Sequence, residues 1–192
     1  PKSGIMFQEH SGISVVSGNY IGINGSGSDI GNRQEAITLF SNTSGVTIEN
    51  NVLANSRVNG IAVRVSSSNN TIRNNEVFGN KENGVNLEGS NNNLVSVNEI
   101  YSNGGNGIEL RLDYRETIGS SQNTVVGNLI GNTDGSSVAK ENGVHGVYIR
   151  HTSSRNNIGT TDNGNIIRNK QNGNAIYVEG SGTNRNKIRG NS

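Results

Sequence analysis

Tyrosine, arginine and carboxylate side chains fall at matching places in successive stretches of this 192-residue sequence. Stretches such as GIELR (107–111) and GVYIR (146–150) begin with Gly and an aliphatic residue, and charged or aromatic residues then alternate with aliphatic ones. These side chains suit a sugar polymer, because Tyr rings stack on sugar rings and Arg pairs with carboxylates. The residues predicted to contact a polysaccharide are Arg64, Glu88, Glu109, Arg111, Tyr148, Arg150 and Tyr177.

Two of these residues are also candidates for catalysis. Glycoside hydrolysis uses two carboxyl groups about 5 to 9.5 Å apart, and Glu88 and Glu109 are expected in adjacent repeats. No Ser-His-Asp arrangement is recognised, and the Gly-rich stretch GINGSG (22–27) lacks the Lys-Ser/Thr of a phosphate-binding loop. A plainer alternative is that Arg64, Glu88 and Arg111 form a ladder of salt bridges on a solvated face.

Metal and cofactor binding have little support in the sequence. The chain contains no Cys, so it has neither disulfides nor thiolate metal ligands. Its only Asp residues are Asp29, Asp113, Asp134 and Asp162, which fall in different repeats. We therefore predict no metal site and no cofactor, with a calcium site using Asp134 or Asp162 and backbone carbonyls as the weak alternative.

A series of repeats must position these side chains. Each repeat begins with Gly or Ala followed by Ile or Val, and we call this pair its opening. The openings are Gly4-Ile5, Ala36-Ile37, Gly60-Ile61, Gly84-Val85, Gly107-Ile108, Gly146-Val147 and Ala175-Ile176. The spacing between consecutive openings is 32, 24, 24, 23, 39 and 29 residues. A period near 24 residues fits either a leucine-rich repeat or a parallel β-helix, and the dominance of Ile and Val over Leu favours the β-helix.

Composition points the same way. Only 30% of the residues are hydrophobic, 27 are Gly and 35 are Asn. A compact globule would need more apolar mass, whereas a repeat needs only a few inward side chains in each unit. We predict an all-β chain: a right-handed, single-stranded parallel β-helix of about seven coils, each with three short strands. Residues 1–192 then form a single domain, expected to be an interior segment of a longer protein.

The abundant asparagines are predicted to have a structural role. An Asn closes each repeat at Asn19, Asn51, Asn75, Asn98, Asn128, Asn169 and Asn191. Each of these follows an apolar residue by three positions, at Val16, Ile48, Ile72, Val95, Val125, Ile166 and Ile188. Asn tolerates left-handed turns, and its amide can pass hydrogen bonds between stacked coils. The alternatives are ligand binding by the same residues, or glycan attachment at Asn24, Asn42 or Asn69.

Longer segments carry a resemblance to a known family. The segments 18–39, 127–149 and 156–169 resemble units of bacterial secreted β-helix proteins, and the whole chain is similar to the pectin-lyase-like superfamily of right-handed parallel β-helices. That resemblance implies the fold, and a polysaccharide bound along the first strand of each coil. The Asp-Pro-His signature of alginate epimerases, the signatures of polygalacturonases and the Asp clusters of pectate lyases are absent.

Three functions remain open at this point. The first is a non-catalytic scaffold or surface protein, secreted or on the cell surface, with a carbohydrate-binding face. The second is a polysaccharide lyase, hydrolase or epimerase, and the third is a fibre segment that stacks end to end. The formal net charge is +1 and charges are not clustered in the sequence, so no nucleic-acid partner is predicted. No apolar run approaches 18 residues, so no membrane span is predicted either.

Overall fold

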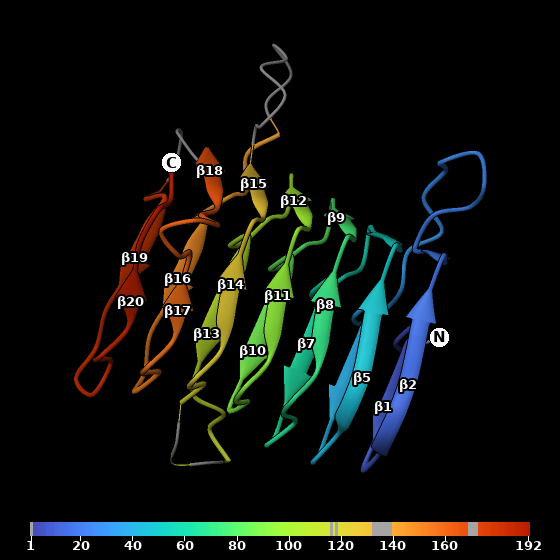
Figure 1. Ribbon diagram of the computed structural model, residues 1–192. Coiled ribbons are helices and arrows are strands. Elements are labelled where there is room, and N and C mark those ends of the chain that lie inside the picture. The colour runs from blue at the N-terminus through green and yellow to red at the C-terminus, as the bar shows by residue number, and fades with distance from the viewer. Residues whose placement is uncertain (1, 116, 118, 132–139, 169–172) are drawn as a thin grey trace.

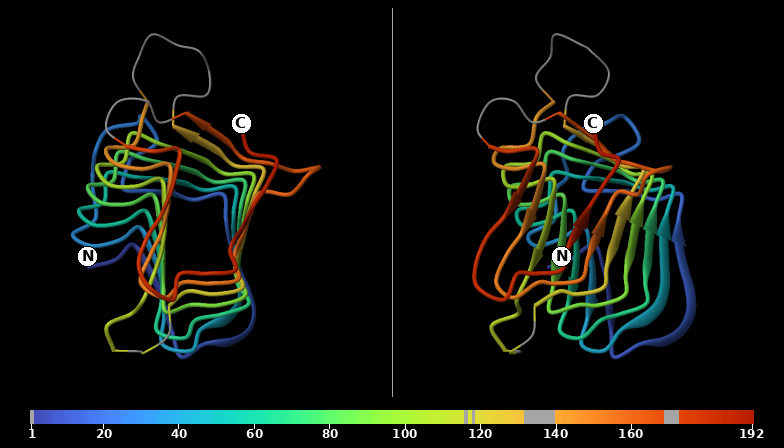
Figure 2. Two further views of the ribbon diagram at one scale, coloured as in Figure 1. Left: turned by 90° about the vertical axis from the view of Figure 1, so that its left-hand side faces the viewer. Right: turned by 60° about the vertical axis from the view of Figure 1, so that its left-hand side comes forward.

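The chain winds into seven coils of β-structure that stack side by side (Figure 1). The computed structural model describes residues 2–115, 117, 119–131, 140–168 and 173–192. Within those ranges it contains twenty strands and no helix. Viewed along the axis, successive coils superimpose on one another (Figure 2, left). The predicted right-handed parallel β-helix is confirmed.

Three parallel sheets run the length of the molecule, and each takes one strand from each coil. Sheet A contains β1 (Ile5–Gln8), β4 (Ile37–Phe40), β7 (Ile61–Arg64), β10 (Val85–Glu88), β13 (Ile108–Arg111), β16 (Val147–Ile149) and β19 (Ile176–Val178). Sheet B contains β2 (Ser11–Ser17), β5 (Ser44–Glu49), β8 (Thr71–Arg73), β11 (Leu94–Ser96), β14 (Thr124–Val126), β17 (Asn157–Ile158) and β20 (Lys187–Ile188). Sheet C has six strands: β3 (Tyr20–Ile21), β6 (Val52–Ala54), β9 (Glu76–Phe78), β12 (Glu99–Tyr101), β15 (Leu129–Gly131) and β18 (Ile166–Arg168).

Aliphatic columns fill the interior of the coils. In sheet A the first residue of each strand pairs in register with the first residue of the next, so Ile37, Ile61 and Val85 lie above one another. All three are fully buried. Gly84, which opens the fourth coil, allows this close stacking, because a Cβ there would lie 2.4 Å from Ile100 and 2.7 Å from the Gly107 carbonyl. The aliphatic residues that alternate with charged ones in the sequence thus stack as columns inside the coils.

Asparagine ladders join the coils at their corners. The side-chain Oδ1 of Asn75 accepts hydrogen bonds from the backbone N and the Nδ2 of Asn51, and Asn98 repeats this towards Asn75. The same contacts extend the ladder over Asn19, Asn51, Asn75, Asn98, Asn128, Asn165 and Asn191. A second ladder contains Asn70, Asn93, Asn123, Asn156 and Asn186. The structural role predicted for asparagine is confirmed at these positions.

One member of the predicted series was wrong. Asn165, and not Asn169, continues the ladder in the sixth coil, and Asn169 itself lies outside the described residues. The apolar residue of that coil in sheet B is Ile158, which pairs with Val125, whereas Ile166 belongs to sheet C. An extra loop between Ile158 and Asn165 replaces the usual short corner, and it displaces the apparent repeat by one strand.

At each corner of a coil, one residue turns the chain and the next residue makes the ladder hydrogen bonds. The ladder asparagines have negative φ, and all but Asn19, Asn186 and Asn191 at the ends of the ladders are buried. With the exception of Gly164, which precedes Asn165, the residue before a ladder asparagine turns the chain left-handed, as Asn74 (φ 54°) does before Asn75. In the next coil this turn position holds Val97 (φ 56°), which is 55% exposed. A β-branched residue is strained in the left-handed region, whereas Asn and Gly are not.

Replacing Val97 with Asn is therefore expected to stabilise the protein by about 1 kcal/mol. That corresponds to a rise in Tm of about 2–4 °C for a chain of this size. The reciprocal change Asn74→Val, one coil away, is the matched control and should lower Tm by a similar amount. Thermal unfolding followed by circular dichroism measures both, and an unchanged or lower Tm for Val97→Asn would contradict the strain argument.

Candidate functional site

The outer face of sheet A carries the residues predicted to bind a ligand. Asn86, Glu109 and Tyr148 are register partners along one outward column, and Glu88 and Arg111 are register partners in the next. Tyr177 follows Tyr148 on β19. All seven predicted residues lie on this one face, where they form two groups: an ion-pair row over coils two to five and an aromatic group over the last two coils.

The ion-pair row alternates acids and bases across four coils. Arg64 contacts Glu35 at 2.8 Å and Glu88 at 3.2 Å, and Arg111 donates to Glu88 at 2.9 Å. Glu88 is only 7% exposed although its side chain faces outward, because the two guanidinium groups cover it. The alternative of a salt-bridge ladder thus describes the observed contacts of Arg64, Glu88 and Arg111.

Glu35 is a member of the row that sequence reasoning missed. It lies before the opening of the second coil, at the place where the next three coils have Asn59, Asn83 and Asn106. Its side chain is buried and bonds Arg64 in the coil above. The signal that could have found it is this break in an otherwise uniform asparagine column.

Glu109 links the ion-pair row to the aromatic group. Its carboxylate accepts from Arg150 at 2.8 Å and from the Asn83 side chain at 2.8 Å, and the residue is 3% exposed. The two carboxylates proposed as catalytic candidates, Glu88 and Glu109, are therefore both buried and both held by cations. Arg150 also lies over the ring of Tyr148, with 5.0 Å between its guanidinium carbon and the ring centroid.

The aromatic group consists of Tyr148, Tyr177 and His145. The two Tyr rings stack with centroids 5.4 Å apart, and the His145 ring lies 5.1 Å from Tyr148 and 4.7 Å from Tyr177. The Tyr148 hydroxyl donates a hydrogen bond to Glu179, the residue that follows β19. Glu179 directly follows β19 and was not among the predicted site residues.

Protonation in this group follows from its contacts. Burial, and then the hydrogen bond to Glu179, raise the pKa of Tyr148 to about 12. The same hydrogen bond is the largest cause that lowers the pKa of Glu179. Burial lowers the pKa of His145, whose Nδ1 accepts from the backbone N–H of Asn174 at 3.0 Å. At neutral pH the group therefore presents two phenols, a neutral imidazole with its proton on Nε2, and one carboxylate.

A loop after β13 lies beside the ion-pair row. Asp113 binds Arg115 at 2.7 Å, and Arg115 in turn lies 5.3 Å from the ring centroid of Phe40, three coils away. The hydrogen bond from Arg115 is the largest cause that lowers the pKa of Asp113. Glu116, the next residue in the sequence, lies outside the described residues. Through Arg115 this loop reaches from the fifth coil to Phe40 in the second.

The described residues contain no group of three His, Asp or Glu side chains arranged to hold a metal ion. Of the two calcium candidates, Asp162 lies in an exposed turn, and Asp134 is outside the described residues. The described part of the chain also forms no helix that is long and apolar enough to cross a membrane.

Comparisons with known proteins identify the fold more closely. Residues 3–192 match the family described as the right handed beta helix region. A mutant of the periplasmic alginate epimerase AlgG superposes with a TM-score of 0.68 and 23% identity, over 93% of this chain and 36% of that one. The A-module of the mannuronan C-5 epimerase AlgE4 from Azotobacter vinelandii superposes with a TM-score of 0.63 and 15% identity, over 98% of this chain and 54% of that one.

At these identities the likeness to the solved structures establishes the fold alone. The chain spans about a third to a half of the length of those two structures. A comparison with curated protein sequences gave no match. The family match, in contrast, covers nearly the whole sequence and agrees with the three parallel sheets. The chain therefore belongs to the right-handed β-helix family.

Proposed function

We propose that this chain is a non-catalytic β-helical scaffold that binds an acidic polysaccharide on the outer face of sheet A. The observation that carries the proposal is the aromatic group of Tyr148, Tyr177 and His145, whose rings gather on a flat, rigid sheet. Tyr177 is 36% exposed, so its ring is open to a ligand. Aromatic faces beside charged groups are the surface on which sugar rings stack while their polar substituents are bonded.

Charges next to the rings favour an acidic sugar. Arg150 lies between Tyr148 and Glu109, and its side chain keeps about a quarter of its surface exposed. A uronate carboxylate could bind the exposed part of this guanidinium while its ring stacks on Tyr177. The neutral His145 offers its Nε2 proton to a hydroxyl or carboxylate in the same place.

The contacts of the acidic residues support binding rather than catalysis. A general acid or base needs a carboxyl, imidazole or phenol free to exchange a proton near neutral pH. Glu88 and Glu109 are each engaged by cations, the Nδ1 of His145 is occupied by a backbone N–H, and the pKa of Tyr148 is raised to about 12. The enzymatic alternative lacks a group with the required freedom among these residues.

Similar solved structures support the substrate class and the location. Their names describe epimerases of alginate and of mannuronan, and one of them is described as periplasmic. These names are consistent with a polysaccharide partner. They are also consistent with a position on the cell surface or in the secreted fraction. The proposal therefore extends to a secreted or surface-exposed protein.

Affinity electrophoresis in gels containing alginate, polygalacturonate or dextran tests the binding face. We expect retardation by one of the two acidic polymers, and a loss of affinity of up to roughly tenfold in Tyr177→Ala, because stacking of one ring contributes about 0.5–1.5 kcal/mol beyond the area it buries. Tyr20→Ala is the matched control, since Tyr20 is 64% exposed but lies on sheet C. Unretarded migration of the native protein in both acidic gels would refute the proposal.

Product assays separate binding from catalysis. Incubation with the same polymers should yield neither unsaturated products, nor new reducing ends, nor a changed C-5 epimer ratio. Activity that disappears in Glu109→Gln while the fold is retained would overturn the non-catalytic assignment and favour the lyase, hydrolase or epimerase alternative.

A further inference from the structure

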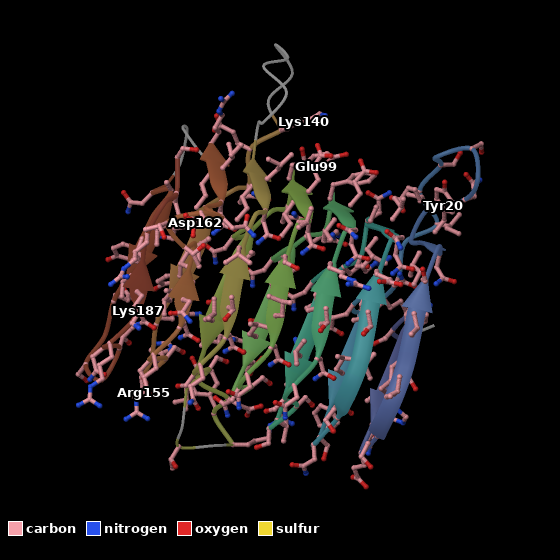
Figure 3. The ribbon with its side chains drawn as sticks, in the orientation of Figure 1. Tyr20, Glu99, Lys140, Arg155, Asp162 and Lys187 are labelled. Atoms are coloured by element: carbon pink, nitrogen blue, oxygen red, sulfur yellow. The ribbon has the colours of Figure 1, made fainter. Side chains whose placement is uncertain are left out.

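A second polar hollow lies on a different face of the molecule. It opens on the outer side of sheet B towards the later coils, and it is lined by Asn92, Gln122, Arg155, Asn157, Arg185 and Lys187. Figure 3 shows Arg155 and Lys187 projecting from the last two coils. Arg185 and Lys187 are two residues apart, and stacking of the coils brings Arg155 to the same depression, which has no carboxylate among its lining residues.

Positive charge in this hollow is uncompensated. Among the described residues, Arg155, Arg185 and Lys187 make no ion pair, and all three are exposed. Several arginines elsewhere are paired: on the same sheet Arg73 binds Glu49 at 2.6 Å, and on sheet A Arg64 and Arg111 share Glu88. Three unpaired cations close together repel one another, and an anion placed between them would remove that repulsion.

The backbone beneath two of these cations is unfavourable for arginine. Asn69, Asn92, Gln122, Arg155 and Arg185 occupy one column, each directly before a ladder asparagine, and each has φ between 56° and 59°. The earlier coils use Asn, which tolerates this conformation best among residues with a Cβ. Arg155 and Arg185 accept the strain, and neither side chain makes a hydrogen bond within the described chain. A bound ligand explains the presence of arginine at these strained positions better than the needs of folding do.

We propose that this hollow is a second binding site, for the anionic groups of an acidic polysaccharide, separate from the aromatic face of sheet A. Arg155, Arg185 and Lys187 bind carboxylate or sulfate groups, and the amides of Asn92, Gln122 and Asn157 bond neighbouring hydroxyls. Coils stack at about 4.8 Å, so a chain lying along the helix axis meets cations on the last two coils and amides on the two before them. Binding on both sheets would allow one β-helix to hold two polymer chains.

The lining chemistry favours a polysaccharide over nucleic acid. Single-stranded nucleic acid is held by aromatic rings that stack on bases, and no aromatic residue lines the hollow. Duplex binding draws on many phosphate contacts, and only three cations are present. Amides interleaved with cations fit a polymer that carries hydroxyl groups and spaced charges.

A triple variant tests the site without threatening the fold. Arg155→Asn and Arg185→Asn restore the residue type of the earlier coils, and Lys187→Asn copies its register partner Asn157. We expect the Tm to stay the same or rise, and the affinity for polygalacturonate or chondroitin sulfate to fall at least tenfold at low salt. The matched control removes three positive charges elsewhere, through Arg57→Asn, Lys81→Asn and Arg168→Asn, and should bind nearly as well as the native chain.

A variant that lacks the sheet A aromatic rings distinguishes binding at this hollow from binding at the sheet A face. In Tyr148→Ala/Tyr177→Ala, which disables the sheet A face, the binding that remains should weaken with rising salt and disappear with the triple variant. No residual binding in that background would overturn the second site while leaving the sheet A proposal intact. Equal loss of affinity in the charge-matched control, or tighter binding of DNA or of anionic lipid vesicles than of either acidic polysaccharide, would also overturn it.

Discussion

Asn75→Ala is expected to destabilise the protein by about 4 kcal/mol, because several buried hydrogen-bonding groups lose their partner at once. The Nδ2 of Asn75 donates to the carbonyls of Ile48 and Arg73 and to the Oδ1 of Asn98. Its Oδ1 accepts from the backbone N–H and the Nδ2 of Asn51. The residue is 2% exposed, so water does not replace these bonds without opening the corner.

The neighbouring residue supplies a matched control. Asn74 has the same side chain and lies in the same corner, but it is exposed and serves the left-handed turn instead. Asn74→Ala should cost only about 1 kcal/mol, the strain of placing Ala in that conformation. Urea unfolding of both variants gives the difference in the free energy of unfolding. Equal losses for the two variants would mean that the ladder contributes no more than the turn.

Much of the fold could be predicted because its signal is local. Alternation within a strand decides which side chains face inward, and the openings at Ile37, Ile61 and Val85 place successive strands in register. The prediction for the sixth coil was wrong because nothing local distinguishes Ile158 from Ile166. Both are aliphatic residues followed at a distance by asparagine. Only the pairing with Val125 on the coil below shows that Ile158 is the equivalent residue.

The candidate site was predictable in its position but not in its contacts. Alternation places Arg64, Glu88 and Tyr148 on the outer face without reference to any other coil. Which groups touch depends on how far long side chains reach between coils, so the partners Glu35 and Glu179 were missed. The cation cluster of the sheet B hollow was not predicted for the same reason, since Arg155 and Arg185 come together only in the folded chain.

Glu88→Gln is the second change with a large expected effect, about 2 kcal/mol of destabilisation. The variant keeps the shape and one oxygen acceptor but removes the charge that both Arg64 and Arg111 share. Arg64 retains Glu35 at 2.8 Å, and both arginine side chains keep about a fifth of their surface in water. The remaining partner of Arg64 and the partial exposure of both whole arginine side chains reduce the loss below the value of about 3–5 kcal/mol for a fully buried pair.

Glu49→Gln provides the comparison, since Glu49 pairs with Arg73 at 2.6 Å on sheet B and Arg73 is half exposed. A pair so open to solvent contributes roughly 0–1 kcal/mol and is screened by salt. Urea unfolding at low salt and in 1 M NaCl should therefore show a loss for Glu88→Gln that persists, and a smaller loss for Glu49→Gln that vanishes. If Glu88→Gln costs no more than Glu49→Gln, the ion-pair row does not hold the coils together.

The same variant tests how the face of sheet A is divided. If the ion-pair row is structural and the aromatic group binds the ligand, Glu88→Gln should lower stability and leave retardation in polysaccharide gels unchanged. Tyr177→Ala should do the reverse, because its ring is exposed and carries no coil-to-coil ion pair. Loss of polysaccharide binding in folded Glu88→Gln would instead extend the binding face over both groups, and would assign Arg64 and Arg111 to the ligand as well as to the fold.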